Sequence, residues 1–278
     1  MLRVGLLITA LCLVGAGCAV NEVIVAEETT LVVSETPVDE SRLLDIGVVE
    51  FSPGLDEDND PRKTGVWDEI RLAETKYLSY HLKNTLQGTG HWGAVRVIPS
   101  REAFTDVVVS GNIEQSNGEY VTLEITVEDA AGRHWYDRKY ETQTGVTSFS
   151  DRRDRRLDPY QKVFNDIAND LHAFASSLPP KQLEQTRQVS ELRFFADMSP
   201  LAYGQHLASD EDGIAEIVRL PAENDPTVAR LRQIRERDRL VIDTLNEHYA
   251  NFYYGIAIPY RNWRKVSRQE AVAFREVK

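Results

Sequence analysis

The chain has 278 residues, enough for one large domain or two modest ones. It carries 44 Asp and Glu residues against 32 Lys and Arg residues, a formal net charge of −12 at pH 7. This acidic balance argues against nucleic acid as a partner and against electrostatic docking on anionic lipid, because both reward a basic surface.

The first eighteen residues have the pattern of an export signal. A short positive start ending at Arg3 is followed by an almost purely apolar stretch over residues 4–14, and three small residues then precede Cys18. A signal peptidase needs small side chains before its cut, and a thiol can carry a lipid afterwards. The pattern resembles a bacterial lipoprotein signal, although Gly15 stands where Leu or Val is usual. It predicts a signal peptide over residues 1–17 and lipidation at Cys18.

Two other interpretations of the leader stay open. One is ordinary secretory cleavage, and the other is a retained membrane anchor, for which the apolar stretch is shorter than the ~20 residues that a spanning helix needs. Ala19 follows the cysteine, and the lipoprotein resemblance then implies the outer membrane, with the protein on its periplasmic face. Cys12 would leave with the leader, so the mature chain would keep Cys18 alone and no disulfide is expected within the subunit.

The elements that follow the leader indicate a strand and a long helix. Residues 18–42 are expected to form a tether, with one edge strand as an alternative for part of them. The β-branched, apolar residues 43–51 predict a central strand buried on both faces. After a polar loop, apolar residues recur at helical spacing over residues 67–87, and Gly88 and Gly90 are expected to end this helix. A short strand over residues 95–98 comes next.

The clearest β pattern lies in the middle of the chain. Residues 106–114 and 120–127 are separated by a segment that contains Asn117–Gly118, and both of these residues tolerate the positive φ of a tight hairpin turn. A further strand is expected over residues 134–140. Three adjacent antiparallel strands form a meander, and a helix can pack on one of its faces.

The last part of the chain has helical patterns. Asp158–Pro159 and Asp225–Pro226 each offer an N-cap followed by proline at the first helical position, and another helix is expected over residues 181–196. Ser267 begins a capping-box pattern that predicts a separate terminal helix. We therefore expect an α/β (α+β) fold, in which a mixed sheet with a β-meander packs on a long helix and a mostly helical C-terminal region follows.

The order of strand, long helix, short strand and meander behind a lipoprotein leader resembles the amino-terminal domain of TolB and the related CsgG group of curli secretion. The best local match is the segment 107–113, followed by the hairpin and the turn at 129–132. The resemblance covers about residues 43–142, which places one domain over residues 43–150 and leaves residues 151–278 as a helical region. It implies action in envelope assembly and export through protein contacts.

An acidic loop is the most suggestive metal-binding pattern. Asp56, Asp58 and Asp60 have the alternate spacing that can collect oxygen ligands around calcium. An EF-hand loop would need Gly and Glu where this chain has Pro61 and Trp67. A solvated acidic loop ahead of a helix is the favoured interpretation, with adventitious calcium as the alternative.

The remaining chemical motifs predict no catalytic residue, cofactor site or metal site. His81 and His91 flank a helix end without the spacing of a metal site, and Ser110 lacks the glycine pattern of a nucleophile elbow. The basic run at residues 152–156 favours a solvated loop, with contact to an anionic polymer or lipid headgroups as the alternative.

Aromatic residues gather near the carboxyl end and form the candidate partner-binding site. They are Phe252, Tyr253, Tyr254, Tyr260 and Trp263. Large rings beside arginine dominate binding hot spots, but they also fill cores, and core packing is the favoured interpretation.

Together these features predict a lipoprotein held on the periplasmic face of the outer membrane by a lipid at Cys18. It would act as a non-catalytic binding or assembly component of a cell-envelope machine, with another envelope protein as its partner. One alternative is a periplasmic hydrolase of cell-wall or surface carbohydrate, which needs an open cleft with two close carboxylates in unlike environments. Another is a ring-forming export component, which would make the protein a homo-oligomer.

Overall fold

The computed structural model describes residues 28–39, 42–55, 66–101, 104–145, 147–150 and 157–276. The leader with Cys18, the acidic loop at residues 56–60 and the basic run at residues 152–156 lie outside the described residues.

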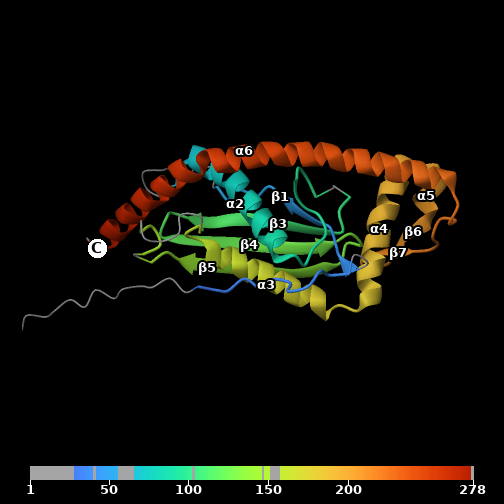
Figure 1. The fold of residues 1–278 in the computed structure, drawn as a ribbon, viewed down its shortest axis with the longest axis horizontal. Helices are drawn as coiled ribbons and strands as arrows, with labels where there is room; N and C mark the ends of the chain where they lie inside the picture. The colour runs from blue at the N-terminus through green and yellow to red at the C-terminus, as the bar shows by residue number, and fades with distance from the viewer. Residues whose placement is uncertain are drawn as a thin grey trace, which may run out of the picture.

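A five-stranded mixed sheet with the order β2-β1-β3-β4-β5 forms the centre of the molecule (Figure 1). Its strands are β1 (Ile46–Val49), β2 (Val95–Ile98), β3 (Val107–Ser116), β4 (Tyr120–Asp129) and β5 (His134–Gln143). β1 pairs in parallel with β2 and β3, whereas β3, β4 and β5 pair antiparallel as the predicted meander. The sheet and the helices around it confirm the α+β fold class.

Two glycines mark the end of a helix and a hairpin turn in the first half of the chain. The helix α2 (Asp68–Thr89) connects the parallel strands β1 and β2, which need such a crossover. It ends at Gly90 with φ 69°, whereas the predicted stop at Gly88 is wrong, because that residue lies inside the helix. The β3–β4 hairpin turns at residues 117–119, where Gly118 has φ 80° but Asn117 does not have a positive φ. The side-chain oxygen of Asn117 accepts the backbone N–H groups of Glu119 and Tyr120 at 3.0 and 2.7 Å.

The main core lies between the sheet and the helices α2 and α3 (Gln161–Ser177). Alternate residues of β4 are buried in it, and the residues between them are only partly covered, because successive side chains of a strand point to opposite faces. The buried β4 residues are Val121, Leu123, Ile125 and Val127. α3 adds Val163, Phe164, Ile167 and Leu171 to the same core. The opposite face of the meander is polar.

A smaller group of elements packs at one end of the sheet. It consists of α4 (Pro180–Met198), α5 (Pro200–Tyr203), a 3₁₀ turn (Gly204–His206), and the short strands β6 (Leu207–Ser209) and β7 (Ala215–Ile217). β6 and β7 form a separate two-stranded sheet that the sequence did not predict. This group has its own apolar cluster, formed by Leu192, Phe194, Phe195, Tyr203, Val228 and Leu231.

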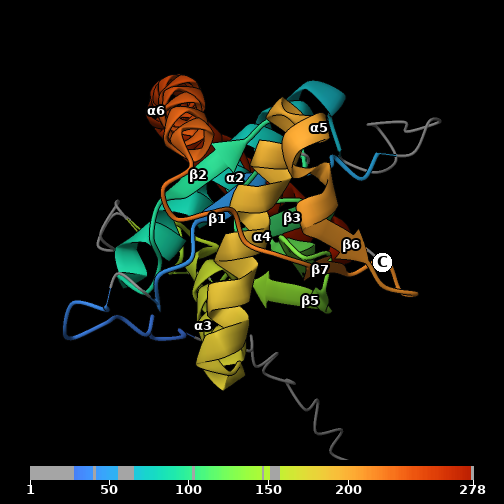
Figure 2. The same cartoon turned by 90° about the vertical axis from the view of Figure 1, so that its right-hand side faces the viewer.

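The last helix, α6 (Pro226–Glu276), runs along the whole molecule above the sheet (Figure 1) and is seen nearly end-on in Figure 2. Its 51 residues correspond to about 76 Å at 1.5 Å per residue. The helix bends in its C-terminal part, and Pro259, which lacks an N–H and crowds the preceding turn, accounts for such a bend. The predicted separate terminal helix is wrong, because Ser267 lies inside α6 and its hydroxyl donates to the carbonyl oxygen of Asn117 at 2.8 Å.

The two Asp–Pro pairs behave differently. Asp225 caps α6 as predicted, since its carboxylate accepts the N–H of Thr227 at 2.8 Å. The predicted start of α3 at Pro159 is wrong, because that helix begins only at Gln161. The Asp158 carboxylate accepts the N–H of Tyr160 at 2.8 Å and is otherwise used in an ion pair with α6.

Part of the expected tether contacts the folded body. The side chain of Asn165 in α3 donates to the carbonyl oxygen of Thr29 at 2.6 Å, and the side chain of Asn169 bonds both Thr30 and Val32. Residues 29–32 therefore lie along α3. Within the described part of the chain, no helix is both long and apolar enough to span a bilayer.

Candidate functional site

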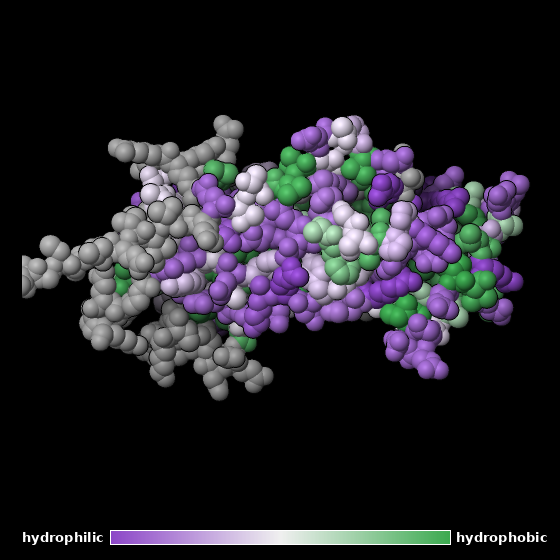
Figure 3. Space-filling model, turned by 90° about the horizontal axis from the view of Figure 1, so that it is seen from below, coloured by the Kyte–Doolittle hydropathy of each residue, from purple (hydrophilic) through white to green (hydrophobic). Residues whose placement is uncertain are grey.

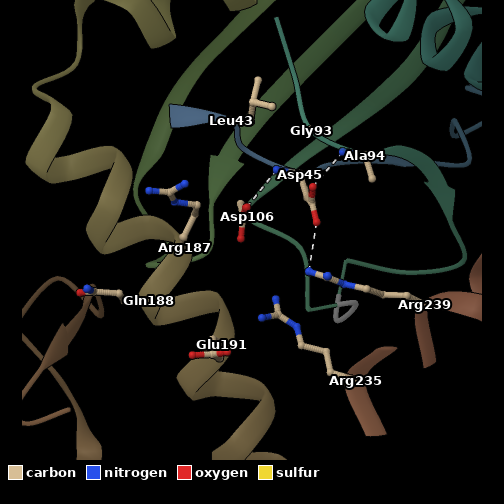
Figure 4. Close-up of a pocket in the computed structure, with 10 residues that line it drawn as sticks. All are labelled: Leu43, Asp45, Gly93, Ala94, Asp106, Arg187, Gln188, Glu191, Arg235 and Arg239. Atoms are coloured by element: carbon tan, nitrogen blue, oxygen red, sulfur yellow. Dashed lines mark hydrogen bonds and ion pairs between the residues drawn. The ribbon is translucent and has the colours of Figure 1, made fainter. Parts of the chain in front are cut away.

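An open cavity of about 440 Å³ lies where the sheet, α4 and α6 meet (Figure 4). Its lining carries six charged side chains: Asp45, Asp106, Arg187, Glu191, Arg235 and Arg239. The acids Asp45 and Asp106 come from the segments just before β1 and β3, whose parallel pairing brings them side by side. α4 contributes Arg187 and Glu191, and α6 contributes Arg235 and Arg239.

The two aspartates hold this end of the sheet together. The backbone N–H of Asp45 donates to the Asp106 carboxylate at 2.9 Å, and the Asp45 carboxylate accepts the N–H of Ala94 at 2.8 Å. A Cβ atom on Gly93 would lie 2.5 Å from the Asp45 carboxylate, so glycine is needed for this close approach. Burial raises the pKa of Asp106, and the neighbouring charge of Asp45 acts in the same direction.

Most charged groups around the cavity are already paired. Arg239 donates to the carboxylate of Asp45 at 3.0 Å and to that of Glu236 at 2.8 Å. Glu191 accepts two hydrogen bonds from Arg232, at 2.8 and 3.1 Å. These exposed and half-exposed pairs draw the first turns of α6 toward α4 and toward the loop before β1.

Arg235 differs from the other arginines. Its side chain is buried, and its Nη2 atom donates to the carbonyl oxygen of Phe104 at 3.1 Å and to the hydroxyl of Ser190 at 2.7 Å. Its Nε atom is buried without a hydrogen-bond partner. Within the described residues, no carboxylate lies within ion-pair distance of its guanidinium, which points into the space between α6 and the two aspartates (Figure 4).

The electrostatic surroundings of Arg235 are mixed. Burial lowers the pKa of its guanidinium, and the neighbouring Arg239 charge lowers it further. The charges of three acids oppose this lowering of the pKa, namely Asp106, Glu191 and Asp45. No local sequence pattern predicted this site, because its residues are spread from position 45 to position 239 and meet only in the fold.

The predicted aromatic residues of α6 separate into inward and outward positions. Tyr260 is buried, and Tyr253 and Trp263 pack against the main core. Phe252 is partly buried under the ammonium group of Lys76, whereas the Tyr254 side chain is 67% exposed. Core packing therefore accounts for most of this cluster.

The inward aromatic residues surround a buried polar network. Arg264 forms a bidentate ion pair with Asp158, and its guanidinium lies 4.2 Å from the ring centroid of Tyr260. The hydroxyl of Tyr260 donates to the Glu74 carboxylate at 2.6 Å, and Glu74 also pairs with Arg71 at 2.9 Å. The network ties α6 to α2 and to the chain before α3, which gives it a structural role.

The predicted histidines lie in packed environments. His81 is buried, and its ring bonds the Tyr253 hydroxyl at 2.7 Å and the Gln161 side-chain oxygen at 2.9 Å. His91 stacks on His172 with ring centroids 3.6 Å apart. The hydroxyl of Ser110 bonds Arg101 on the polar face of the sheet. Among the residues described, no group of three or more His, Cys, Asp or Glu side chains could hold a metal ion.

Large apolar side chains are exposed along α6. We define its outer face by Leu240, Val241, Leu245, Tyr254 and Ile258. Ile258 is 73% exposed and Val241 is 61% exposed, on the side of the helix turned away from the core. The face seen in Figure 3 is largely hydrophilic, with hydrophobic residues gathered at the end where α4, α5 and the β6–β7 hairpin lie. Exposed apolar residues of that end are Met198, Leu201, Val218 and Leu220.

Comparison with known proteins gives little information. No family model and no curated protein matches the sequence. Among solved structures, the dodecamer of a PelC point variant from Paraburkholderia phytofirmans is similar at 17% identity, over 54% of this chain and 98% of that chain, with a TM-score of 0.29. A similarity at that TM-score supports no statement about function.

Proposed function

We propose that this protein is an outer-membrane lipoprotein, lipidated at Cys18 and facing the periplasm, that acts as a binding or assembly component of a cell-envelope machine. The leader sequence supports the anchor, because an apolar stretch and small residues precede the cysteine. The outer face of α6 supports the binding role and is the observation on which that role rests.

The outer face has the properties of a protein-binding surface. The long helix exposes apolar side chains at a spacing of four residues in two pairs, Val241 with Leu245 and Tyr254 with Ile258. Side chains spaced in this way share a helix side and can pack against an apposed element. Exposed apolar side chains that gather on one element mark interaction sites more often than scattered ones do. We assign the surface to a second envelope protein that lays a helix or sheet face along α6.

The test is recovery of the partner by chemical cross-linking in intact cells. Replacing Val241→Glu and Leu245→Glu together should abolish a cross-linked product that the wild type forms, because two carboxylates would be desolvated in the interface. Ala173→Glu and Ser176→Glu together introduce the same two charges at exposed positions of α3 and should leave the product intact. A product that persists in the double variant, or one that contains only further copies of this chain, would reject this assignment.

A second candidate function is the carbohydrate hydrolase. The observation that favours it is the open cavity, in which Asp45 and Asp106 lie side by side in unlike environments: one is paired with Arg239 and the other is buried. If these acids act in hydrolysis, purified protein should release reducing ends from envelope polysaccharide, and Asp106→Asn should stop the release. The backbone hydrogen bonds that both acids accept are equally well explained by a structural role.

A further inference from the structure

The buried guanidinium of Arg235 lacks the direct ion pair that such a group normally has. An arginine side chain that is only 8% exposed is expensive to bury unless an anion pairs with it and its N–H groups are satisfied. Arg264, buried to a similar degree, meets this requirement through two 2.8 Å bonds to Asp158. Within the described residues, Arg235 has hydrogen bonds to a carbonyl and a hydroxyl only, and both come from its Nη2 atom.

The Nη1 atom is the part of the Arg235 guanidinium that a ligand can reach. In the described structure it makes no hydrogen bond, and Arg235 lines the cavity, whereas the Nε atom is without a partner but fully buried. Figure 4 shows the guanidinium directed into the cavity rather than into the core. An anionic oxygen in the cavity can accept from the Nη1 atom and supply the negative charge that is not directly paired with this guanidinium, and a carboxylate is such an acceptor.

The other walls of the cavity limit the charge of a ligand. Asp45, Asp106 and Glu191 line the same space, so a dianion would be repelled by nearby carboxylates. Their oxygens can instead accept hydrogen bonds from hydroxyl or amino groups of a ligand. The charges lining the cavity therefore favour a ligand that carries one negative charge and several hydrogen-bond donors.

The size of the cavity limits the ligand further. About 440 Å³ lies at the lower end of the range for small-molecule sites, so the space suits a molecule of about monosaccharide size. We propose that this cavity binds a small, donor-rich molecule with a single carboxylate, such as a sugar acid, and that Arg235 holds the carboxylate. The site uses the inward side of α6, so variants of its outer face should leave it intact.

Isothermal titration of the full-length protein in detergent tests the proposal. The probes are glucuronate, glucose and inorganic phosphate. Glucuronate should bind at least about tenfold more tightly than glucose, because a charged hydrogen bond to a buried arginine is lost with the neutral sugar. Equal binding of the two sugars overturns the proposal, and phosphate binding as tightly as glucuronate overturns the choice of a singly charged carboxylate.

Two variants with opposite expected effects separate binding from folding. Arg235→Gln should weaken glucuronate binding by more than about tenfold. Glu191→Gln removes a negative charge from the cavity wall and should tighten binding, a result that a misfolded protein could not give. Arg230→Gln, at an exposed position of the same helix, should change nothing. Wild-type affinity in Arg235→Gln, or weaker binding in Glu191→Gln, would contradict the assignment.

Discussion

Arg264 of α6 and Asp158, the residue three positions before α3, form a buried bidentate ion pair in which both N–O distances are 2.8 Å. The two residues are far apart in the sequence, and the pair closes the C-terminal part of α6 onto the rest of the fold. Attraction to Arg264 keeps the pKa of Asp158 well below its ordinary value even though burial alone would raise it.

Breaking this pair should destabilise the protein strongly. Arg264→Met would leave the Asp158 carboxylate buried with only the Tyr77 hydroxyl and the Tyr160 N–H as partners. We expect the free energy of unfolding, measured by urea denaturation, to fall by roughly 3–5 kcal/mol. Arg232→Met breaks the exposed pair with Glu191 and should lower it by less than about 1 kcal/mol. A similar decrease in the free energy of unfolding in the two variants would show that the buried Arg264–Asp158 pair stabilises the protein no more than the exposed pair does.

The stability of the protein should depend on pH through His81. Burial lowers the pKa of this imidazole, with Arg264 acting in the same direction and Asp158 and Gln161 opposing it. The unfolded chain therefore binds a proton at about pH 6.5 while the folded protein does not, so stability is present above that pH and is lost as the pH falls below it.

The variant His81→Gln isolates this effect. Between pH 6.5 and 5, the free energy of unfolding of the wild type should fall more steeply than that of the variant, by up to about 1.4 kcal/mol per pH unit. His134→Gln, at an exposed position on β5, should keep the wild-type slope. Parallel curves for wild type and His81→Gln would mean that His81 does not titrate in this range.

Two glycines with nearly equal backbone angles allow a steric test of how α6 contacts the hairpin. Gly118 has φ 80° and Gly213 has φ 82°. A Cβ atom on Gly118 would lie 2.2 Å from the carbonyl oxygen of Arg264, whereas one on Gly213 would meet nothing within 4 Å. Both substitutions to alanine strain the backbone by about 1–2 kcal/mol. Gly118→Ala should lower the free energy of unfolding clearly more than Gly213→Ala does, and equal losses would be inconsistent with the α6–hairpin contact.

The lipid anchor can be tested without reference to the fold. The mature natural protein should begin at Cys18 and carry the mass of a diacylglyceryl or triacyl group, measured by intact mass spectrometry. Cys18→Ser should stay in the aqueous fraction after detergent phase partitioning, where the wild type should enter the detergent. A natural product that still begins at Met1 would contradict the predicted processing.

Local sequence patterns correctly predicted the elements that are determined by residues close together in the sequence. The meander, α2 with its Gly90 end and the Asp225 cap of α6 follow from alternation, helical spacing and capping chemistry. The start of α3 was misplaced because the Asp158 carboxylate is used by a distant arginine as well as by the local backbone. Ser267 has the pattern of a helix start, but its hydroxyl is bonded to the hairpin, and packing carries α6 through both this residue and Pro259.

The cavity could not be predicted in the same way. Asp45 and Asp106 become neighbours only through the parallel pairing of β1 and β3, and Arg239 reaches Asp45 only because α6 turns back over the sheet. The aromatic residues of α6 carried a pattern visible in the sequence, yet spacing alone did not tell which rings face inward. Tyr260 and Tyr254 lie close in sequence and differ completely in burial.

The contact between residues 29–32 and α3 has a consequence for orientation if Cys18 carries the lipid. Only about ten residues then separate the lipidated Cys18 from Thr29, where the chain first contacts α3. Fully extended, these residues span at most roughly 40 Å. The contact of residues 29–32 with α3 would hold the α3 side of the molecule near the membrane. The helices α3 and α6 lie on opposite sides of the molecule in Figures 1 and 2. The helix α6 would then face away from the membrane, where a periplasmic partner can bind it.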